Sequence, residues 1–134
     1  MSSFIQIALA TNAQNAQRVL QTFTCYSSLN VGDPVYIDPS TNNFVLKPAD
    51  NYSTQKIIGV CYQKIGSTTA RVILLGVMGG FSSLTLGATV FLSDSGTLSQ
   101  TRPTNTGYLQ NLGIAVSDSE ILVIPNNVRV KLTA

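Results

Sequence analysis

The chain has 134 residues, of which 44% are hydrophobic and only 10% are charged, and its formal net charge is +2. A chain of this length is typical of one domain, and this apolar content is sufficient to build a buried core. The longest apolar runs, residues 72–75 and 121–124, are too short to cross a membrane, and the basic residues are too scattered to form a nucleic-acid interface.

Residues 1–21 are predicted to form an N-terminal arm or an added strand, next to a single β domain over residues 22–134. The opening MSSFIQIALATNAQ has no basic region ahead of its apolar residues, so we expect no secretory signal and synthesis in a cytoplasm. The apolar side chains of the arm favour docking on a neighbouring subunit or a larger assembly by strand addition. An ordinary first strand of the same sheet is an equally good interpretation. The residues expected to bind a partner are Phe4, Ile5, Ile7 and Leu9.

The rest of the chain alternates between short β runs and turn residues, and the one helical candidate, residues 13–20, is too short to trust. Turns are indicated by DPSTNN and SDSG, where Pro39 and Gly96 provide the backbone conformations that turns need. This pattern predicts an all-β fold, either a β-barrel or a β-sandwich. The predicted strands cover residues 19–25, 34–37, 43–46, 57–63, 70–78, 89–92, 97–100, 113–117, 120–125 and 128–132.

The sequence repeats itself at an offset of 54 to 55 residues. SSLNVGDPVYI at residues 27–37 matches SSLTLGATVFL at residues 82–92 in five of eleven positions, and IGVC at 58–61 matches LGIA at 112–115. Two similar halves of about fifty residues are therefore predicted, which pair to bury a shared apolar face. Chance similarity between β-hairpins is the alternative. The expected halves span residues 27–78 and 82–132, and the repeated glycines Gly32/Gly87 and Gly59/Gly113 are predicted to mark bulges or close backbone approaches.

Catalytic and metal-binding signatures are missing from the sequence. The chain has no histidine, which excludes a Ser-His or Cys-His nucleophile pair within one chain. Most of the six carboxylates stand in predicted turns, and Asp118 and Glu120 are expected to line an exposed hairpin. Residues 94–96 (DSG) form only a fragment of a calcium loop. We therefore expect no catalytic residues, no cofactor and no metal site.

The two cysteines, Cys25 and Cys61, both lie in predicted strands. They are too few to form a zinc site alone. A disulfide is possible if their strands are neighbours, but in the absence of a secretion signal a buried free thiol at each position is the favoured interpretation.

The low charge content also bears on function. A typical soluble domain has about 25% charged residues. A surface with few charges and many hydroxyl and amide groups favours self-association. The composition therefore indicates a chain that covers much of its surface with neighbouring subunits, although a plain β domain with a neutral surface fits as well.

The motifs TCYSSLNVGDPVYID, IIGVCYQKIGSTTARVILLGVM, LTLGATVFLSDSGTLSQTRP and GYLQNLGIAVSDSEILVIPN together resemble a small β module of tailed-bacteriophage virions. Such modules occur in capsid decoration (cement) proteins and head-fibre proteins, and also within tail-fibre proteins. The resemblance covers residues 22–126. It implies a non-enzymatic structural subunit, often a homotrimer, that binds the major capsid protein on the head surface of the virion and has neither a nucleic-acid nor a membrane partner.

Two other functions stay open at this point. A head- or tail-fibre component would attach to a host surface polymer, and exposed tyrosines such as Tyr52 and Tyr108 could then stack on sugars, or could be packed against the barrel. A small hydrolase that uses only carboxylates belongs to a different class. Glycan binding would favour the first of these, and turnover abolished by an aspartate substitution would favour the second.

Overall fold

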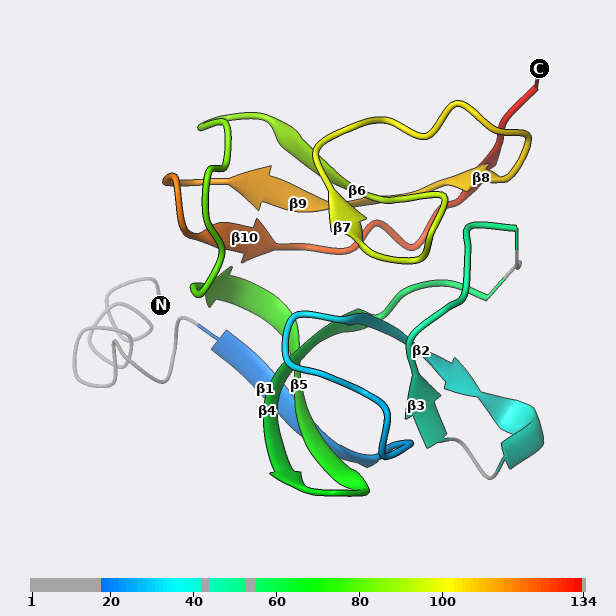
Figure 1. Ribbon diagram of the computed structural model, residues 1–134, viewed down its shortest axis with the longest axis vertical. Helices are drawn as coiled ribbons and strands as arrows, with labels where there is room; N and C mark the ends of the chain where they lie inside the picture. Colours follow the sequence, from blue (N-terminus) through cyan, green and yellow to red (C-terminus); the bar gives the residue numbers. More distant parts are fainter. Residues whose placement is uncertain (1–17, 42–43, 53–54, 134) are drawn as a thin grey trace, which may run out of the picture.

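The computed structural model describes residues 18–41, 44–52 and 55–133, and in these ranges the chain is almost entirely β-structure (Figure 1). The predicted all-β fold is confirmed. Every predicted β run overlaps an observed strand, and the structure adds one short strand that the sequence did not predict. No helix in the described ranges has the length and hydropathy needed to span a membrane.

The strands are short, as the frequent turn residues predict. In chain order they are β1 (Arg18–Thr24), β2 (Pro34–Asp38), β3 (Phe44–Leu46), β4 (Gly59–Gly66), β5 (Thr69–Met78), β6 (Thr89–Leu92), β7 (Leu98–Ser99), β8 (Tyr108–Leu109), β9 (Asn111–Ala115), β10 (Ile121–Val123) and β11 (Val130–Lys131), with one 3-10 turn, η1 (Pro39–Thr41), after β2.

Most strands belong to one curled antiparallel sheet, which forms a half-barrel. Its order is β3-β2-β4-β5-β10-β9-β6-β7, β1 pairs with β5 beside this path, and β8 and β11 form a separate pair. In Figure 1, β1 to β4 lie in the lower part of the molecule and β6 to β10 in the upper part. The first half therefore contributes β3, β2 and β4, the second half contributes β10, β9, β6 and β7, and β5 lies between them.

Strand β5 belongs to both halves. Its residues 69–73 pair with β4, and its residues 76–78 pair with β10. Gly76 pairs with Arg18 of β1 and also with Val123 of β10, so these two strands lie on opposite edges of β5. The end of β5 therefore takes the same position beside β10 in the second half that β1 takes beside β5 in the first half. The chain that follows supports this correspondence, because GGFSSL at residues 79–84 parallels TCYSSL at residues 24–29.

The repeated sequence produces repeated hydrogen bonds. The amide of Gly32 donates to the carbonyl of Cys61 at 2.9 Å, and the amide of Gly87 donates to that of Ala115 at 2.8 Å. Both glycines have positive φ, 94° and 81°, a conformation that residues with a Cβ adopt at a cost. A side chain at either position would meet open space. Glycine is therefore favoured at these two positions by the backbone conformation. The sequence had predicted bulges or close backbone approaches there, and the structure shows no close approach.

The second pair of repeated glycines marks close approaches, as predicted. A Cβ at Gly59 would stand 2.2 Å from the carbonyl oxygen of Ile73, and one at Gly113 would stand 2.1 Å from that of Leu122. In each half the glycine strand, β4 or β9, thus lies against the backbone of the strand that follows it. The same steric constraint explains why the same residue occurs at both positions.

The core consists of three groups of buried side chains. One fills the curl of the first half, one lies between the halves around Ile73 and Ile121, and a small third group joins Ile57 to Leu92 and Leu112. Burial alternates along β6 and over parts of β5, so that alternate side chains of these strands point into the core. The first group contains Cys25, Leu29, Val35, Val45, Cys61, Ala70 and Val72.

Two buried amide side chains link the halves. Asn51 and Asn105, which are 54 residues apart, donate to each other's side-chain oxygens at 2.9 and 2.7 Å. The Asn51 amide also donates to the carbonyl of Tyr108 at 3.0 Å. Gln110 accepts from the amide of Ile57 and donates to its carbonyl, both at 3.0 Å. These hydrogen bonds satisfy buried polar groups at places where the two halves of the chain are not joined by paired strands.

The expected arm falls partly inside the described residues. Residues 18–21 begin β1, so the expected boundary after residue 21 falls within a strand that pairs with β5 over residues 18–24. The predicted partner-binding residues Phe4, Ile5, Ile7 and Leu9 lie outside the described residues.

Candidate partner-binding surface

Three exposed aliphatic side chains form a row across neighbouring strands. Val19 of β1 pairs with Leu75 of β5. Ile124 follows Val123, the last residue of β10, which pairs with Gly76, so the antiparallel register extended by one residue brings Ile124 beside Leu75 on the other edge of β5. These three side chains are 49%, 44% and 52% exposed. Because directly opposed residues of a sheet project from the same face, the structure presents one apolar row, which we call the β1–β5 row.

A groove of about 470 Å³ adjoins this row at the open end of the first half. Gln21 and Phe23 of β1 line it, and they share the face of Val19 because alternate residues of a strand point the same way. Leu74 and Pro125 also line the groove. In the sequence, Leu74 directly precedes the row residue Leu75, and Pro125 directly follows the row residue Ile124. The lining consists of Gln21, Phe23, Ile37, Lys56, Ile57, Ile58, Leu74, Pro125 and Asn127.

The groove is apolar and nearly free of charge. Lys56 is its only charged lining residue, and it lies with Gln21 and Asn127 among otherwise apolar side chains. Phe23 and Leu74 pack against the core of the first half from the groove side. Such a surface gains stability by burial of apolar area, and it offers few polar groups for the recognition of a small polar ligand. The row and groove therefore suit an apolar segment of protein.

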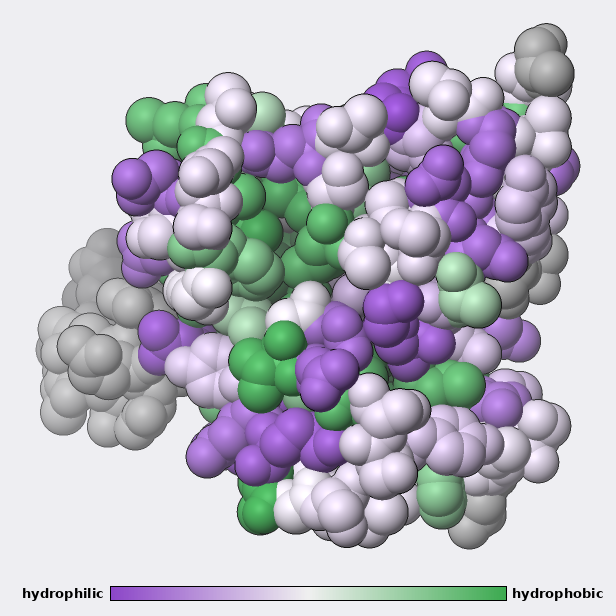
Figure 2. Space-filling view, viewed as in Figure 1, coloured by the Kyte–Doolittle hydropathy of each residue, from purple (hydrophilic) through white to green (hydrophobic). Residues whose placement is uncertain are grey.

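A second apolar hollow is much smaller. Figure 2 shows apolar side chains gathered between β7 and the segment that follows β5. The cavity there is only about 50 Å³ and is bordered by Phe81, Leu84 and Leu98, which pack against the core between the halves. This hollow is an imperfection in core packing at the surface and is too small for a ligand.

The two tyrosines suggested for sugar stacking lie at one site. The ammonium of Lys131 stands 5.2 Å from the ring centre of Tyr108 and 6.0 Å from that of Tyr52. The guanidinium of Arg129 stands 5.2 Å from the Tyr108 ring. Cations at these distances interact with the ring faces. Tyr108 is thus engaged by two cations, and Tyr52, half exposed, retains free ring surface.

The basic side chains of this site are held by backbone carbonyls. Arg129 donates to the carbonyl of Gln55, and Lys131 donates to that of Thr106. Burial lowers the pKa of Arg129 from its ordinary value, and the nearby Tyr108 opposes this shift. The site therefore anchors the strand β11 to the loop before β8, which gives it a packing role whether or not it binds a ligand.

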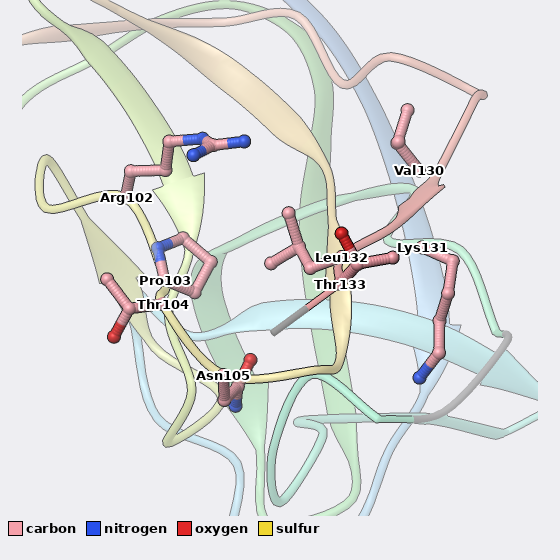
Figure 3. A pocket seen from close by; sticks show the side chains of 8 residues that line it. All are labelled: Arg102, Pro103, Thr104, Asn105, Val130, Lys131, Leu132 and Thr133. Atoms are coloured by element: carbon pink, nitrogen blue, oxygen red, sulfur yellow. The ribbon is translucent and has the colours of Figure 1, made fainter.

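A polar cavity of about 480 Å³ lies next to this tyrosine site, between the loop before β8 and the C-terminal strand (Figure 3). Figure 3 shows Arg102 and Lys131 on opposite sides of it, with Leu132 and Thr133 between them. Among the described residues, none that lines it carries a carboxylate side chain. Its chemistry is that of a mildly basic surface rich in hydroxyl and amide groups.

Most carboxylates lie in turns or at strand ends, close to the sequence prediction that most stand in turns. Glu120 accepts a hydrogen bond from Ser117 in the hairpin between β9 and β10. Asp38 accepts from the hydroxyl and the amide of Ser40, and these hydrogen bonds lower the pKa of its carboxyl group. Within the described ranges, no group of three or more histidine, cysteine, aspartate or glutamate side chains is placed to hold a metal ion.

Both cysteines are buried free thiols, as favoured from the sequence. They belong to the same core group of the first half. Burial, with a smaller contribution from Cys25, raises the pKa of the Cys61 thiol to about 11. Since the thiolate is the reactive form, this environment makes Cys61 inert.

The raised pKa predicts a pH effect on stability. The unfolded chain loses the Cys61 proton at about pH 8.5, whereas the folded protein keeps it up to about pH 11. Unfolding therefore releases a proton between these values, and the free energy of unfolding falls as the pH rises through them. We expect the stability difference between the native protein and Cys61→Ala, measured by urea unfolding, to shrink by about 1–3 kcal/mol from pH 8 to pH 11. A difference that stays constant over this range would contradict the prediction.

A scan of the chain against protein-family models finds no match, and a search of curated proteins finds none either. The two candidate functional sites are the β1–β5 row with its groove and the tyrosine site with its polar cavity. Sequence reasoning named the two tyrosines of the second site, but it missed the row, because Val19, Leu75 and Ile124 are brought together only by strand pairing.

Proposed function

We propose that this protein is a non-enzymatic structural subunit of a tailed-phage virion, which decorates the assembled head and stabilises it. The observation that carries the proposal is the exposed β1–β5 row with its apolar groove, on an all-β chain of which only 10% is charged. Such a surface suits a protein that functions while covered by neighbours. The resemblance of residues 22–126 to decoration and head-fibre modules supports the same role.

The mechanism of stabilisation is preferential binding. A subunit that binds the assembled lattice more tightly than its separate capsid proteins lowers the free energy of the assembled state. Many copies on a symmetric shell make modest individual contacts collectively strong. In this proposal the major capsid protein and further copies of this chain are the partners, and residues Phe4 to Leu9 of the arm contribute to the contact.

The test is immunogold electron microscopy of intact phage particles with antibody against this chain. We expect label distributed over the head, and we expect particles that lack the protein to release their contents at a lower temperature. Label confined to the tail or to single vertices would replace decoration by the fibre function. Intact particles without label would overturn the proposal as a whole.

A second candidate, a head- or tail-fibre component that attaches to a host surface polymer, is favoured by the tyrosine site. The half-exposed ring of Tyr52 lies 6.0 Å from the Lys131 ammonium, and the described residues that line the adjoining polar cavity include Arg102 and Lys131 and no aspartate or glutamate. Aromatic faces beside cations suit sugars that carry acidic groups. A glycan array distinguishes the two functions. Binding to acidic glycans that is lost in Tyr52→Ala supports the fibre function, and an empty array supports decoration.

A further inference from the structure

The β1–β5 row and its groove form one continuous surface. Val19, Leu75 and Ile124 supply the row. Val19 shares its face of β1 with Gln21 and Phe23 of the groove, and Leu74 of the groove is an extra residue of β5 where the register with β1 shifts, so the strict alternation between Leu74 and Leu75 is interrupted there. Pro125 of the groove follows Ile124 beyond the end of β10. A monomer that leaves three half-exposed aliphatic side chains together beside an apolar groove keeps a large apolar patch in water. An occupant is therefore needed that is apolar and extended.

The backbone of β1 also offers unpaired edge groups next to this surface. β1 pairs with β5 along one edge. Among the described residues its other edge is paired with no strand: β3 lies near it, and the one bridge there joins Cys25, just past the end of β1, to Val45. Free edges of this kind accept an added strand, whose main-chain hydrogen bonds give affinity while alternate side chains enter an adjoining groove.

The chain itself contains a segment with matching chemistry. Residues 1–17 carry no charged side chain, and Phe4 to Leu9 (FIQIAL) are apolar at five of six positions. Docking such a segment on this surface takes no charge of the segment itself out of water. The described chain begins at Arg18, immediately before the row residue Val19, so this segment is attached at the edge of the surface.

We infer that residues Phe4 to Leu9 of one copy dock as an added strand on the β1–β5 row and groove of a neighbouring copy. The neighbour is the source that the composition favours, because a surface with few charges has little protection against self-association. An arm that passes from each copy to the next closes into a ring under rotational symmetry, so the geometry suits a small cyclic oligomer. The eight residues of the connection, 10–17, span at most about 28 Å, which sets the distance between adjacent copies.

The inference deepens the proposed function, on which it rests for the role of the oligomer in the virion. Self-association itself is measured with the purified chain, in the absence of phage particles. Light scattering on the full chain is expected to show an oligomer at micromolar concentration. Ile7→Asp in the arm and Leu75→Asp in the row should each weaken association at least tenfold, while the far-ultraviolet circular dichroism stays unchanged. The matched control is Leu86→Asp, at a side chain 69% exposed and outside the row and groove, which should associate as the native chain does.

A mixing experiment identifies the source of the arm. A chain lacking residues 2–12 keeps its groove, and the Leu75→Asp chain keeps its arm, so each alone should be monomeric and the two together should form a heterodimer. A mixture that stays monomeric, or a native chain that is monomeric, would overturn the inference. If the native chain associates in this way but labels no phage particle, the inference stands and the proposed function fails. If antibody against the chain labels the phage head while Ile7→Asp and Leu75→Asp leave self-association unchanged, the proposed function stands and the inference fails.

Discussion

Alanine at position 59 or 113 is expected to lower the free energy of unfolding by about 3 kcal/mol, which corresponds to a fall of about 10 °C in Tm for a domain of this size. The added Cβ would stand 2.2 Å from the Ile73 carbonyl oxygen in one case and 2.1 Å from that of Leu122 in the other. Both obstacles are backbone atoms of a paired strand, so relief requires that β4 separates from β5, or β9 from β10. Thermal and urea unfolding of Gly59→Ala and Gly113→Ala measure the effect.

The matched control for both variants is Gly66→Ala. Gly66 ends β4, and a Cβ there would meet nothing within 4 Å. Removing a glycine at a position without steric conflict restricts the unfolded chain and leaves stability unchanged or raised by about 0.5 kcal/mol. Because the two repeated glycines meet equivalent obstacles, their variants should lose similar amounts. Equal stability of Gly59→Ala and Gly66→Ala would refute the close approach that the structure describes.

Asn51→Asp is expected to produce the second large loss, by about 3 kcal/mol at pH 7. Asn51 is fully buried, and its amide group donates to Asn105 and to the carbonyl of Tyr108. A carboxylate at this position would be an acceptor that faces two acceptors, and its charge would be buried.

The pH dependence of this variant has a definite sign. Burial and the facing oxygens raise the pKa of a carboxyl group at position 51 above the value of about 3.9 in the unfolded chain. The loss of stability therefore grows as the pH rises above 4 and is smallest at pH 4. The control is Asn111→Asp on the exposed side of β9, which should cost little at either pH. Equal Tm values for the two variants at pH 7 would show that the link between the halves contributes little stability.

The sequence predicted the local features of the fold well. Short-range chemistry defines them: the alternation of apolar residues marks the strands, and the DSG turn has Gly96 with a positive φ of 78°. The repeat marked Gly59 and Gly113 as positions where a side chain would not fit, and the buried free cysteines were favoured because the sequence shows no secretion signal. Each of these predictions depends only on residues close together in the chain or on the comparison of its two halves.

Features that depend on which strands pair could not be predicted. The double role of β5 follows from the pairing of Gly76 with both Arg18 and Val123, and no local pattern encodes it. Strand β8 has only two residues, too few for an alternation to be visible. The repeat does contain a sign of the amide pair. A basic residue followed by a proline precedes each asparagine, as Lys47-Pro48 before Asn51 and as Arg102-Pro103 before Asn105, and the two segments are 54 to 55 residues apart.

The double role of β5 has a consequence for how the protein denatures. Loss of order in the first half removes β5, one of the two strand partners of β10, and loss of order in the second half leaves Val77 and Met78 of β5 without a strand partner. Neither half is therefore expected to melt while the other keeps its native structure. The two halves share a single cooperative transition, and damage anywhere in the sheet is felt by the whole chain. This all-or-none behaviour removes the partly opened states on which proteases and aggregation act.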